Sequence, residues 1–511
     1  MQNADDVVSG FSRTALFAFC ILHFVLLSCS KTSPTTSPAS ARTALDQLRR
    51  EITQATQSPG VQRGVWGIVV HSLDRNERLF ELQPRTLLVP ASVAKLAVVA
   101  TAAEAVGWDY QYETTLQATG PIVDGVLKGD LVIVGSGDPT VGGRAGFDQA
   151  DPLTWAMGLR MGGLRRIEGR IIGDDDAIEE PRPQLAWAWD DLGYPSGALF
   201  GALNYQENRM TVSVTAGPAP GAPASIGVDR RKASRPIVSR VVTGAVGTQQ
   251  LIWPEQRPGE SFLTIAGSVP VGAQPAQLSI AVGNPTMWIA SALRAYLQGE
   301  GVEVTGEAWD IDDAMPPPDR TQAQALITTR SRPLRDIVQA LLKDSINLYA
   351  EAVMRLNAPP GQPRTNDAAL EGFTKRLTAW GIPPSGQQQV DGSGLSRRDT
   401  ISAETILAVL QRMHEPHHPS YELSPFVTAL PIAGVDGTLS ERMKKTPAEG
   451  NVRAKTGTMS NIRSLAGYVR TRDDETLAFV AMVNNFEGTG AVANAALDRI
   501  AVTLASFSRS R

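Results

Sequence analysis

The sequence predicts an α/β (α+β) fold in which a mostly β region interrupts a first domain built from both ends of the chain. Strand and helix patterns near the two ends mirror each other, whereas the middle of the chain is rich in Val, Gly and Pro. The chain has 511 residues, which is more than a single hydrophobic core usually holds. More than one domain is therefore expected.

The N-terminal part of the first domain reads helix, strand, strand, helix. A helix is expected from about Ser40, followed by strands at Val65 to Leu73 and Arg78 to Leu82. The run from Pro90 to Val106 is rich in Ala, Val and Leu, with Pro at its start and Gly107 after its end. This composition is typical of a buried helix.

The C-terminal part reads strand, strand, helix. Strands are expected at Ser464 to Arg470 and at Thr476 to Asn484, joined by a charged turn, and a final helix from about Gly490 to Ser506. Strands from both chain ends can then form one antiparallel sheet with helices on its faces.

The middle of the chain holds short strand-like pieces separated by Gly- and Pro-rich loops. These pieces are Leu131 to Val134, Arg170 to Ile172, Met210 to Val214, Leu263 to Ala266 and Gln277 to Val282. We therefore expect residues 43–105 and 328–509 to form the first domain. Residues 106–327 are expected to form one or two mostly β domains inserted into it.

The N-terminus predicts export. Thr14 to Ser28 is apolar but short for a membrane span, so residues 1–28 fit a signal peptide. Cys29 follows in a segment that resembles a bacterial lipoprotein cleavage box, and residues 29–42 are a Ser/Thr/Pro-rich linker. We expect a periplasmic protein with a lipid anchor at Cys29. Ordinary signal cleavage near Ser28 is the alternative.

Composition excludes several other classes of protein. The net charge of −4 gives no general argument for binding nucleic acid. The two cysteines, Cys20 and Cys29, both lie near the N-terminus, so the rest of the chain has neither a disulfide framework nor a thiolate metal site.

Three short motifs stand in an order that is typical of serine acyl-transferases with a lysine base. They are Ser92-Val93-Ala94-Lys95, Ser345-Ile346-Asn347 and Lys455-Thr456-Gly457-Thr458. The spacing in the first motif puts the Lys95 amine on the same helix face as the Ser92 hydroxyl. Ser92 at a helix start would also have unpaired backbone N–H groups near it, which stabilise an oxyanion.

The residue types suggest a division of roles. Lys95 can act as a base only if its pKa falls, and burial together with a second cation, Lys455, would lower it. Ser345 would relay the proton to the leaving amine, and Asn347 would hold Lys95 or the substrate amide. The hydroxyls of Thr456 and Thr458, together with the Lys455 charge, suit a terminal carboxylate.

Each motif has a simpler interpretation when it is taken alone. Ser92 and Lys95 could be a helix cap and a solvated lysine, but Lys95 precedes the apolar run from Leu96 to Val99, which argues against solvation. Ser345 and Asn347 could cap helices, and Lys455 could be an exposed strand lysine. The order of all three motifs favours catalysis.

Further segments resemble the low-molecular-mass class C penicillin-binding proteins, the D-Ala-D-Ala carboxypeptidase/endopeptidase family. The similar segments are PASVAK from Pro90, GSGDPT from Gly135, NLYAE from Asn347, DGSGLSR from Asp391 and LPIAGVDGTL from Leu430. The resemblance covers roughly Ala44 to Phe507 and includes the long gap between the first two motifs, which in this family holds two nested domains.

The resemblance implies a serine transpeptidase/β-lactamase-like catalytic domain and an acyl-enzyme at Ser92. It also implies an oxyanion hole made by the backbone N–H groups of Ser92 and Thr458, with Lys455, Thr456 and Gly457 at the substrate. The expected partners are peptidoglycan stem peptides and β-lactam antibiotics. No cofactor and no metal are expected.

Several alternatives remain open at this stage. A serine β-lactamase shares the three motifs but lacks a large insertion. A related peptidase or esterase could use the same fold, and a wall-binding lipoprotein without activity is the alternative of another class.

Other residues that could form a site have weaker support. A Ser-His-Asp triad has no supporting nucleophile-elbow motif. A metal site at His414, His417 and His418 is disfavoured because prolines interrupt them. The cluster of Trp187, Trp189, Asp190 and Asp191 is expected to be packing and loop surface.

Overall fold

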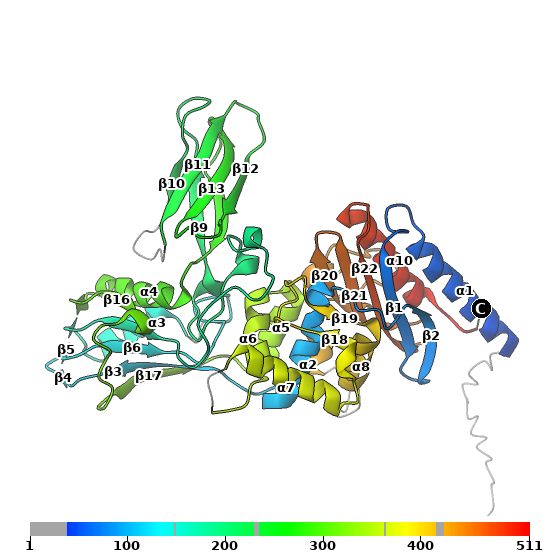
Figure 1. Ribbon diagram of the computed structural model, residues 1–511, viewed down its shortest axis with the longest axis horizontal. Coiled ribbons are helices and arrows are strands. Elements are labelled where there is room, and N and C mark those ends of the chain that lie inside the picture. The colour runs from blue at the N-terminus through cyan, green and yellow to red at the C-terminus, as the bar shows by residue number, and fades with distance from the viewer. Residues whose placement is uncertain (1–37, 148–149, 229–234, 362–363, 415–423, 511) are drawn as a thin grey trace, which may run out of the picture.

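The largest sheet of the protein joins the two ends of the chain. The computed structural model describes residues 38–147, 150–228, 235–361, 364–414 and 424–510. This sheet has the order β2-β1-β22-β21-β20 and is antiparallel throughout (Figure 1). Its strands are β1 (Val65–Ser72), β2 (Glu77–Leu82), β20 (Arg453–Met459), β21 (Ile462–Arg470) and β22 (Thr476–Asn484). The expectation that strands from both chain ends share one sheet is confirmed.

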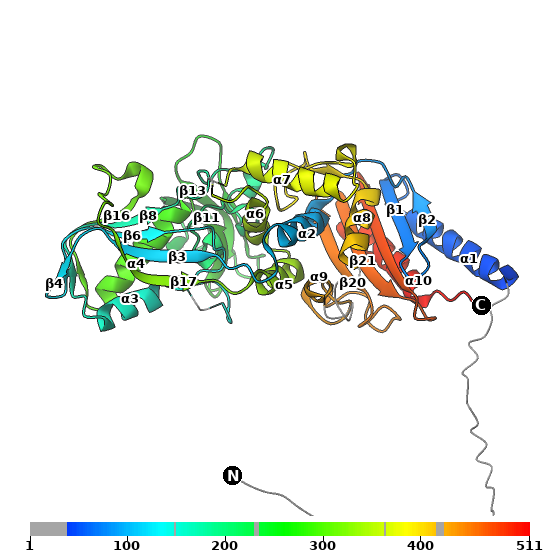
Figure 2. The same cartoon turned by 90° about the horizontal axis from the view of Figure 1, so that it is seen from below.

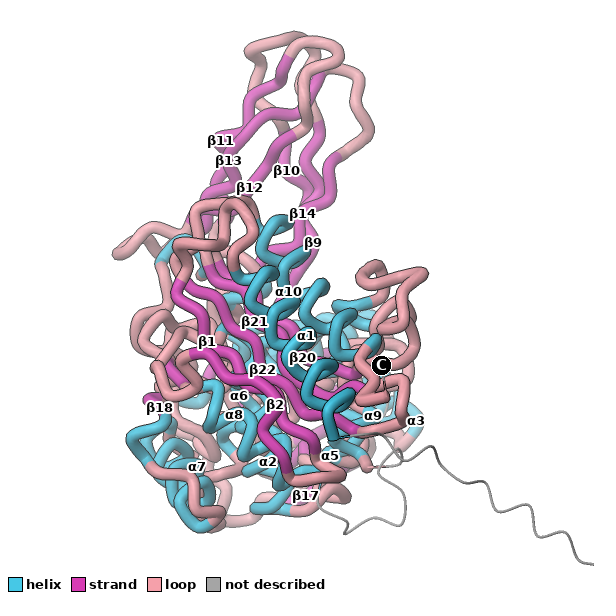
Figure 3. Tube along the Cα trace, turned by 90° about the vertical axis from the view of Figure 1, so that its right-hand side faces the viewer, coloured by secondary structure: helices cyan, strands magenta, loops and turns pink. Residues whose placement is uncertain are grey.

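Helices cover both faces of this sheet. Helices α1 (Pro38–Thr56) and α10 (Gly490–Ser506) lie on one face (Figure 3). Successive residues of β22 alternate between the two cores: Phe479 packs with α1 and α10, whereas Val480 packs with the helices of the opposite face. This alternation follows from the two-residue period of a strand, and burial of both faces explains why β22 is apolar throughout.

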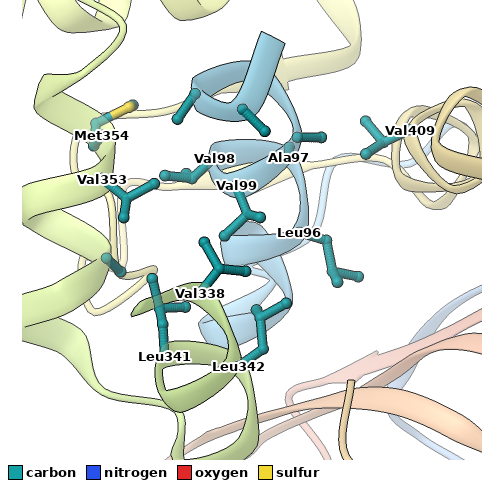
Figure 4. Close-up of a cluster of buried hydrophobic side chains, with 14 of the residues drawn as sticks. Leu96, Ala97, Val98, Val99, Val338, Leu341, Leu342, Val353, Met354 and Val409 are labelled. Carbon is teal, nitrogen blue, oxygen red and sulfur yellow. The ribbon is translucent and has the colours of Figure 1, made fainter. Parts of the chain in front are cut away.

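The opposite face carries a helical layer that surrounds α2. Its helices are α2 (Lys95–Val106), α5 (Leu334–Asp344), α6 (Asn347–Arg355), α7 (Asn366–Ala379), α8 (Ala403–His414) and α9 (Pro425–Thr428). Val98 and Val99 of α2 pack among Leu341, Val353 and their neighbours (Figure 4). Residues 95–103 of α2 are all buried, because its sequence is apolar on nearly every side.

The chain leaves this layer after α2 and returns at α5, and a second sheet lies between these points. Its order is β16-β8-β6-β3-β17, with β6, β8 and β16 parallel. The strands are β3 (Glu113–Ala118), β6 (Leu131–Val134), β8 (Ile171–Asp174), β16 (Ala308–Asp310) and β17 (Gln324–Arg330). A small sheet beside it contains β4 (Ile122–Val123), β5 (Val126–Leu127), β7 (Arg166–Ile167) and β15 (Glu303–Val304).

Two helices also occur in this mostly β region. Helices α3 (Pro152–Met161) and α4 (Pro285–Gly299) pack together, and they share a hydrophobic core with the second sheet. Asp151 and Asn284 cap their N-termini through side-chain hydrogen bonds, and each helix has Pro at its first position.

Two further three-stranded sheets project from the rest of the molecule (Figure 1). They have their own small core, centred on Val212, Val241 and Ile265. Their orders are β10-β9-β14 and β11-β13-β12. The strands are β9 (Arg209–Thr215), β10 (Ser225–Gly227), β11 (Ile237–Gly244), β12 (Leu251–Glu255), β13 (Leu263–Pro270) and β14 (Ala276–Ala281).

The overall shape is elongated, with the helical layer between the large sheet and the inserted sheets (Figure 2). A two-stranded ladder of β18 (Gln387–Gln388) and β19 (Thr400–Ile401) flanks the loop that connects α7 to α8. Within the described ranges, no helix is both long enough and apolar enough to cross a membrane. The predicted signal peptide and Cys29 lie outside the described residues.

Candidate active site

Ser92 lies in a tight 3₁₀ turn, Ala91–Ala94, that leads directly into α2. The turn is enclosed by two close backbone approaches. A Cβ on Gly394 would lie 2.1 Å from the Ala91 carbonyl oxygen, and a Cβ on Gly457 would lie 2.5 Å from that of Pro90. Glycine is therefore required at both positions, and these contacts hold the serine in place.

The second motif is positioned by the junction between two helices. Helix α5 ends at Asp344, and Ser345 adopts a left-handed conformation with φ of 60°. This turn lets α6 begin at Asn347. The side chains of Ser345 and Asn347 consequently point back toward α2, where both contact Lys95.

The side chains of the first two motifs form one contact network. The Lys95 Nζ atom lies 2.8 Å from Ser92 Oγ, and it donates hydrogen bonds to Asn347 Oδ1 at 2.6 Å and to the Ser345 carbonyl oxygen at 3.0 Å. Asn347 in turn donates from Nδ2 to the Ser196 carbonyl oxygen at 2.8 Å. The network therefore reaches from the nucleophile into the inserted region.

Lys455 joins this network through Ser345. Its Nζ atom lies 2.9 Å from Ser345 Oγ, and the same hydroxyl lies 3.3 Å from Lys95 Nζ. Lys455 also donates to the Thr456 carbonyl oxygen at 2.9 Å. The Ser345 hydroxyl thus lies between the two amines, as a proton relay requires.

Both lysines are fully buried, and this changes their protonation. Burial lowers the pKa of Lys95 to about 7, although the carboxylates of Asp391 and Glu351 act in the opposite direction. Burial first, and then the charge on Lys95, lowers the pKa of Lys455 well below its usual value. Two ammonium groups this close cannot both be charged at neutral pH without a large penalty. One member of the pair is thus available as a base.

The third motif lies on β20, where alternate residues point in opposite directions. Thr456 and Thr458 line the cavity in front of Ser92, and Thr456 Oγ1 donates to Thr438 Oγ1 at 2.8 Å. Lys455 and Gly457 are on the other side of the strand. Gly457 lies against the backbone of the nucleophile segment, and Lys455 is fully buried rather than exposed to the cavity.

The cavity has a volume of about 480 Å³. Segments of the chain that are far apart in the sequence form its walls. The lining residues are Ser92, Ala186, Ala188, Asp190, Asp191, Ser196, Ser345, Asn347, Gly394, Leu395, Arg397, Thr438, Thr456, Thr458, Met459 and Ser460. Sequence analysis identified five of these as site residues; it did not assign Ser196, Arg397 or Thr438 to the site.

Asp190 is exposed and Asp191 half-buried, as expected of loop surface, and both also line this cavity, which the sequence did not predict. Burial first, and then the charge on Asp190, raises the pKa of Asp191, while Arg397 opposes this shift. Trp187 is buried, as expected of a packing residue, and its Nε1–H donates to Asp391 Oδ2 at 2.8 Å. A pair of acidic residues beside two tryptophans was the only local signal in the sequence.

Among the described residues, no histidine lines this cavity, so the contacts give no support to a Ser-His-Asp triad. His417 and His418 lie outside the described residues.

Within the described ranges, one group of carboxylates has ligand atoms within 4.8 Å of one another; its members are Asp175, Asp310 and Asp312. Thr286 and Asn284 donate hydrogen bonds to two of them. Burial also raises the pKa of Asp175 to about 7, so protonation of Asp175 can lower the negative charge of the group without an ion.

Comparison with known proteins agrees with this geometry. The family model described as "D-Ala-D-Ala carboxypeptidase 3 (S13) family" matches residues 48–506. A "D-alanyl-D-alanine carboxypeptidase" from Actinomadura sp. (strain R39) is 31% identical over 507 residues, which cover 96% of this chain and 90% of the relative. A second relative, "D-alanyl-D-alanine carboxypeptidase DacB" from Haemophilus influenzae, is 25% identical, with 82% of this chain and 85% of the relative covered.

Solved structures agree as well. The crystal structure of penicillin binding protein 4 (dacB) from Haemophilus influenzae superimposes with a TM-score of 0.76 at 25% identity. That match covers 89% of this chain and 98% of the other chain. A second crystal structure of the same protein, complexed with a novel β-lactam, gives a TM-score of 0.71. The predicted fold class, a transpeptidase-like domain with inserted β structure, is confirmed.

Proposed function

The chain belongs to the D-Ala-D-Ala carboxypeptidase 3 (S13) family, and we propose that Ser92 is the nucleophile of this serine D-alanyl-D-alanine carboxypeptidase. The prediction of a class C penicillin-binding protein and of a serine hydrolase is confirmed by the family match and the named relatives. The proposal for Ser92 rests on one observation above all. Ser92 Oγ lies 2.8 Å from a buried lysine whose pKa is lowered to about 7.

The acylation step follows from these contacts. Neutral Lys95 accepts the proton of Ser92 Oγ as that oxygen attacks the carbonyl carbon of the penultimate D-alanine. The C–N bond to the terminal D-alanine then breaks. The leaving nitrogen takes a proton from Ser345 Oγ, which regains one from the adjacent lysine pair. An ester on Ser92 and free D-alanine result.

Water then hydrolyses the ester, with Lys95 again as the base, and this releases the shortened stem peptide. A β-lactam would acylate Ser92 in the same way by opening its ring. The nitrogen that leaves the carbonyl remains attached to the acyl group, so the adduct would be long-lived. The Haemophilus influenzae relative was crystallised with a β-lactam, which supports the same binding here.

The walls of the cavity suit a peptide that ends in a carboxylate. Thr456 and Thr458 present hydroxyl groups on one side, and the buried amine of Lys455 lies behind them. Charge-assisted hydrogen bonds of this kind are stronger than neutral ones. Backbone N–H groups of Ser92 and Thr458 are proposed as the oxyanion hole.

We further propose that the protein is exported to the periplasm and attached to a membrane through lipid on Cys29. The apolar segment before this cysteine and the polar linker after it support the proposal. Peptidoglycan stem peptides outside the cytoplasm would then be within reach of the enzyme.

Covalent labelling tests the assignment of Ser92. Fluorescent penicillin should form a stable adduct with the wild-type protein and with a control variant, Ser291→Ala on α4, but not with Ser92→Ala. Undiminished labelling of Ser92→Ala would show that the nucleophile is elsewhere. Rapid turnover of the antibiotic by the wild-type protein would instead favour a β-lactamase.

Peptide turnover tests the substrate. A pentapeptide ending in D-Ala-D-Ala should lose one D-alanine, which an amino-acid assay detects. Incubation with cross-linked muropeptide dimers in parallel measures endopeptidase action on the same type of bond. Failure to release D-alanine from the pentapeptide would contradict the proposed reaction.

A further inference from the structure

Two segments that are remote in the sequence meet behind one wall of the cavity. The inserted region contributes residues 185–191, whose side chains include Asp190 and Asp191 in the cavity. The loop between α7 and α8 contributes a tight turn, residues 391–397, which includes Arg397. The contacts between these two segments decide where the wall lies relative to Ser92.

The fully buried Asp391 carboxylate connects the two segments. Its Oδ1 atom accepts the Gly394 N–H and its Oδ2 atom the Ser396 N–H, each at 2.7 Å, which closes the turn. Oδ2 also accepts the indole Nε1–H of Trp187 at 2.8 Å. A second bond joins the same segments, because Ser396 Oγ donates to the Leu185 carbonyl oxygen at 2.7 Å.

The turn itself is held to the catalytic layer independently of Trp187. Glu351 on α6 accepts the N–H groups of Gly392 and Ser393 at 2.9–3.1 Å. Gly394 lies directly against the Ala91 carbonyl, one residue before the nucleophile. The turn is therefore a fixed support, and two hydrogen bonds join residues 185–191 to it.

We propose that Trp187 is a positioning residue whose indole N–H, donated to Asp391, fixes the inserted wall of the cavity to the turn behind Ser92. This inference rests on the proposed function, since it assigns the wall to recognition of the stem peptide. Trp187 acts through Asp391 and does not itself line the cavity. Loss of its N–H should loosen the wall while Ser92 and its lysine base stay in place.

The variant Trp187→Phe removes this donor and keeps an aromatic ring. A hydrogen bond to a charged group contributes enough to give roughly tenfold or more in binding. The KM for a Lys-D-Ala-D-Ala peptide should therefore rise about tenfold, while kcat stays within about twofold of wild type. Acylation by a short benzoyl-D-alanyl thioester, which does not extend to the wall, should not change.

Two further variants make the comparison specific. Trp253→Phe is the matched control, because it removes an indole donor to Glu255 in the projecting sheet and should leave KM unchanged. Ser396→Ala removes the second bond and should raise the peptide KM in the same direction as Trp187→Phe. This variant also tests the proposal if Trp187→Phe does not fold.

Hydrogen exchange tests the contact without reference to activity. In the full-length Trp187→Phe protein, backbone amides of residues 186–192 should exchange faster, while those of α6 keep their wild-type protection. Unchanged exchange in this segment, or an equal loss of kcat for both substrates, would overturn the inference. Failure of the wild-type protein to cleave the peptide would refute the proposed function instead, and the exchange result would still decide the role of Trp187.

Discussion

At the scale of single residues, the site depends on two buried amines that share one hydroxyl. Lys95 and Lys455 both contact Ser345 Oγ and are both fully buried. Burial is the larger cause of the lowered pKa for each, and their mutual repulsion adds to it for Lys455. The protein thereby obtains a neutral lysine next to Ser92 at a pH where an exposed lysine would be charged.

This arrangement predicts the pH dependence of acylation. The protonated form of Lys95 cannot accept the Ser92 proton, so kcat/KM should rise as pH increases through about 7, where Lys95 loses its proton. Burial, and not a charge on Lys455, lowers the pKa of Lys95, and Lys455 loses its proton before Lys95 does. In Lys455→Ala the rise of kcat/KM with pH should therefore stay within a few tenths of a pH unit of its wild-type position. The measurement is acylation rate against pH, with the exposed Lys444→Ala as control. A rise that moves upward by a pH unit or more in Lys455→Ala would mean that Lys455 is charged when Lys95 titrates.

The two threonines of β20 predict how the carboxylate is recognised. Thr456→Val and Thr458→Val each remove one hydroxyl from the cavity wall. Acylation by a free-acid substrate should fall by roughly tenfold or more, since bonds to charged groups contribute about 1.5–3 kcal/mol. Acylation by the corresponding ester should change less. Equal losses for acid and ester would show that these hydroxyls do not contact the carboxylate.

At the scale of elements, the site depends on how closely turns approach the nucleophile segment. Gly394 has a positive φ of 76° and packs against the Ala91 carbonyl, and Ala91 itself has a positive φ of 48°. A non-glycine residue in this region is strained. The 3₁₀ turn that contains Ser92 is therefore held in an unfavourable conformation by its neighbours, and the turn at Asp391 supports it.

Gly394→Ala tests this support. The added Cβ would lie 2.1 Å from the Ala91 oxygen, so the nucleophile segment must shift and acylation should fall more than about tenfold. The control is Gly107→Ala, which has a comparable positive φ of 82° but no atom within 4 Å of the added Cβ. It should lower the free energy of unfolding by about 1–3 kcal/mol through strain alone. Equal acylation by both variants would contradict the proposed support.

At the scale of the whole molecule, the site is assembled from distant parts of one chain. The neighbouring strands β1 and β22 pair although more than 400 residues separate Val65 from Asn484. The inserted region meets the catalytic layer at Ser196, which accepts a hydrogen bond from Asn347. Folding of the inserted region is thus coupled to the geometry around Lys95.

The proposed lipid anchor at Cys29 determines where the whole molecule is located. Cys29→Ala should release the protein from the membrane fraction, because lipid on this cysteine would supply the apolar attachment. Cys20→Ala is the matched control and should leave the protein membrane-bound. Fractionation followed by fluorescent-penicillin labelling locates each variant. Continued membrane association of Cys29→Ala would favour an uncleaved N-terminal anchor.

Local sequence patterns were sufficient for much of this protein. The apolar run Thr476–Asn484 and the helix Gly490–Ser506 were predicted with the bounds that the structure has. The spacing of Ser92 and Lys95 in one helical segment predicted their contact, and the motif order indicated that Ser345, Asn347 and Lys455 belong to the same site. These features depend on periodicity and short-range spacing, and both can be read from the sequence alone.

Only the tertiary structure decided which other residues reach the cavity. Asp190 and Thr438 lie in short 3₁₀ turns and Arg397 in a loop, where no periodicity relates a residue to its neighbours in space. Lys455 is buried behind Ser345 because β20 packs against the nucleophile segment, and Trp187 reaches Asp391 across 204 positions of sequence. Such contacts follow from how the inserted region packs on the helical layer, and short-range patterns in the chain do not encode that packing.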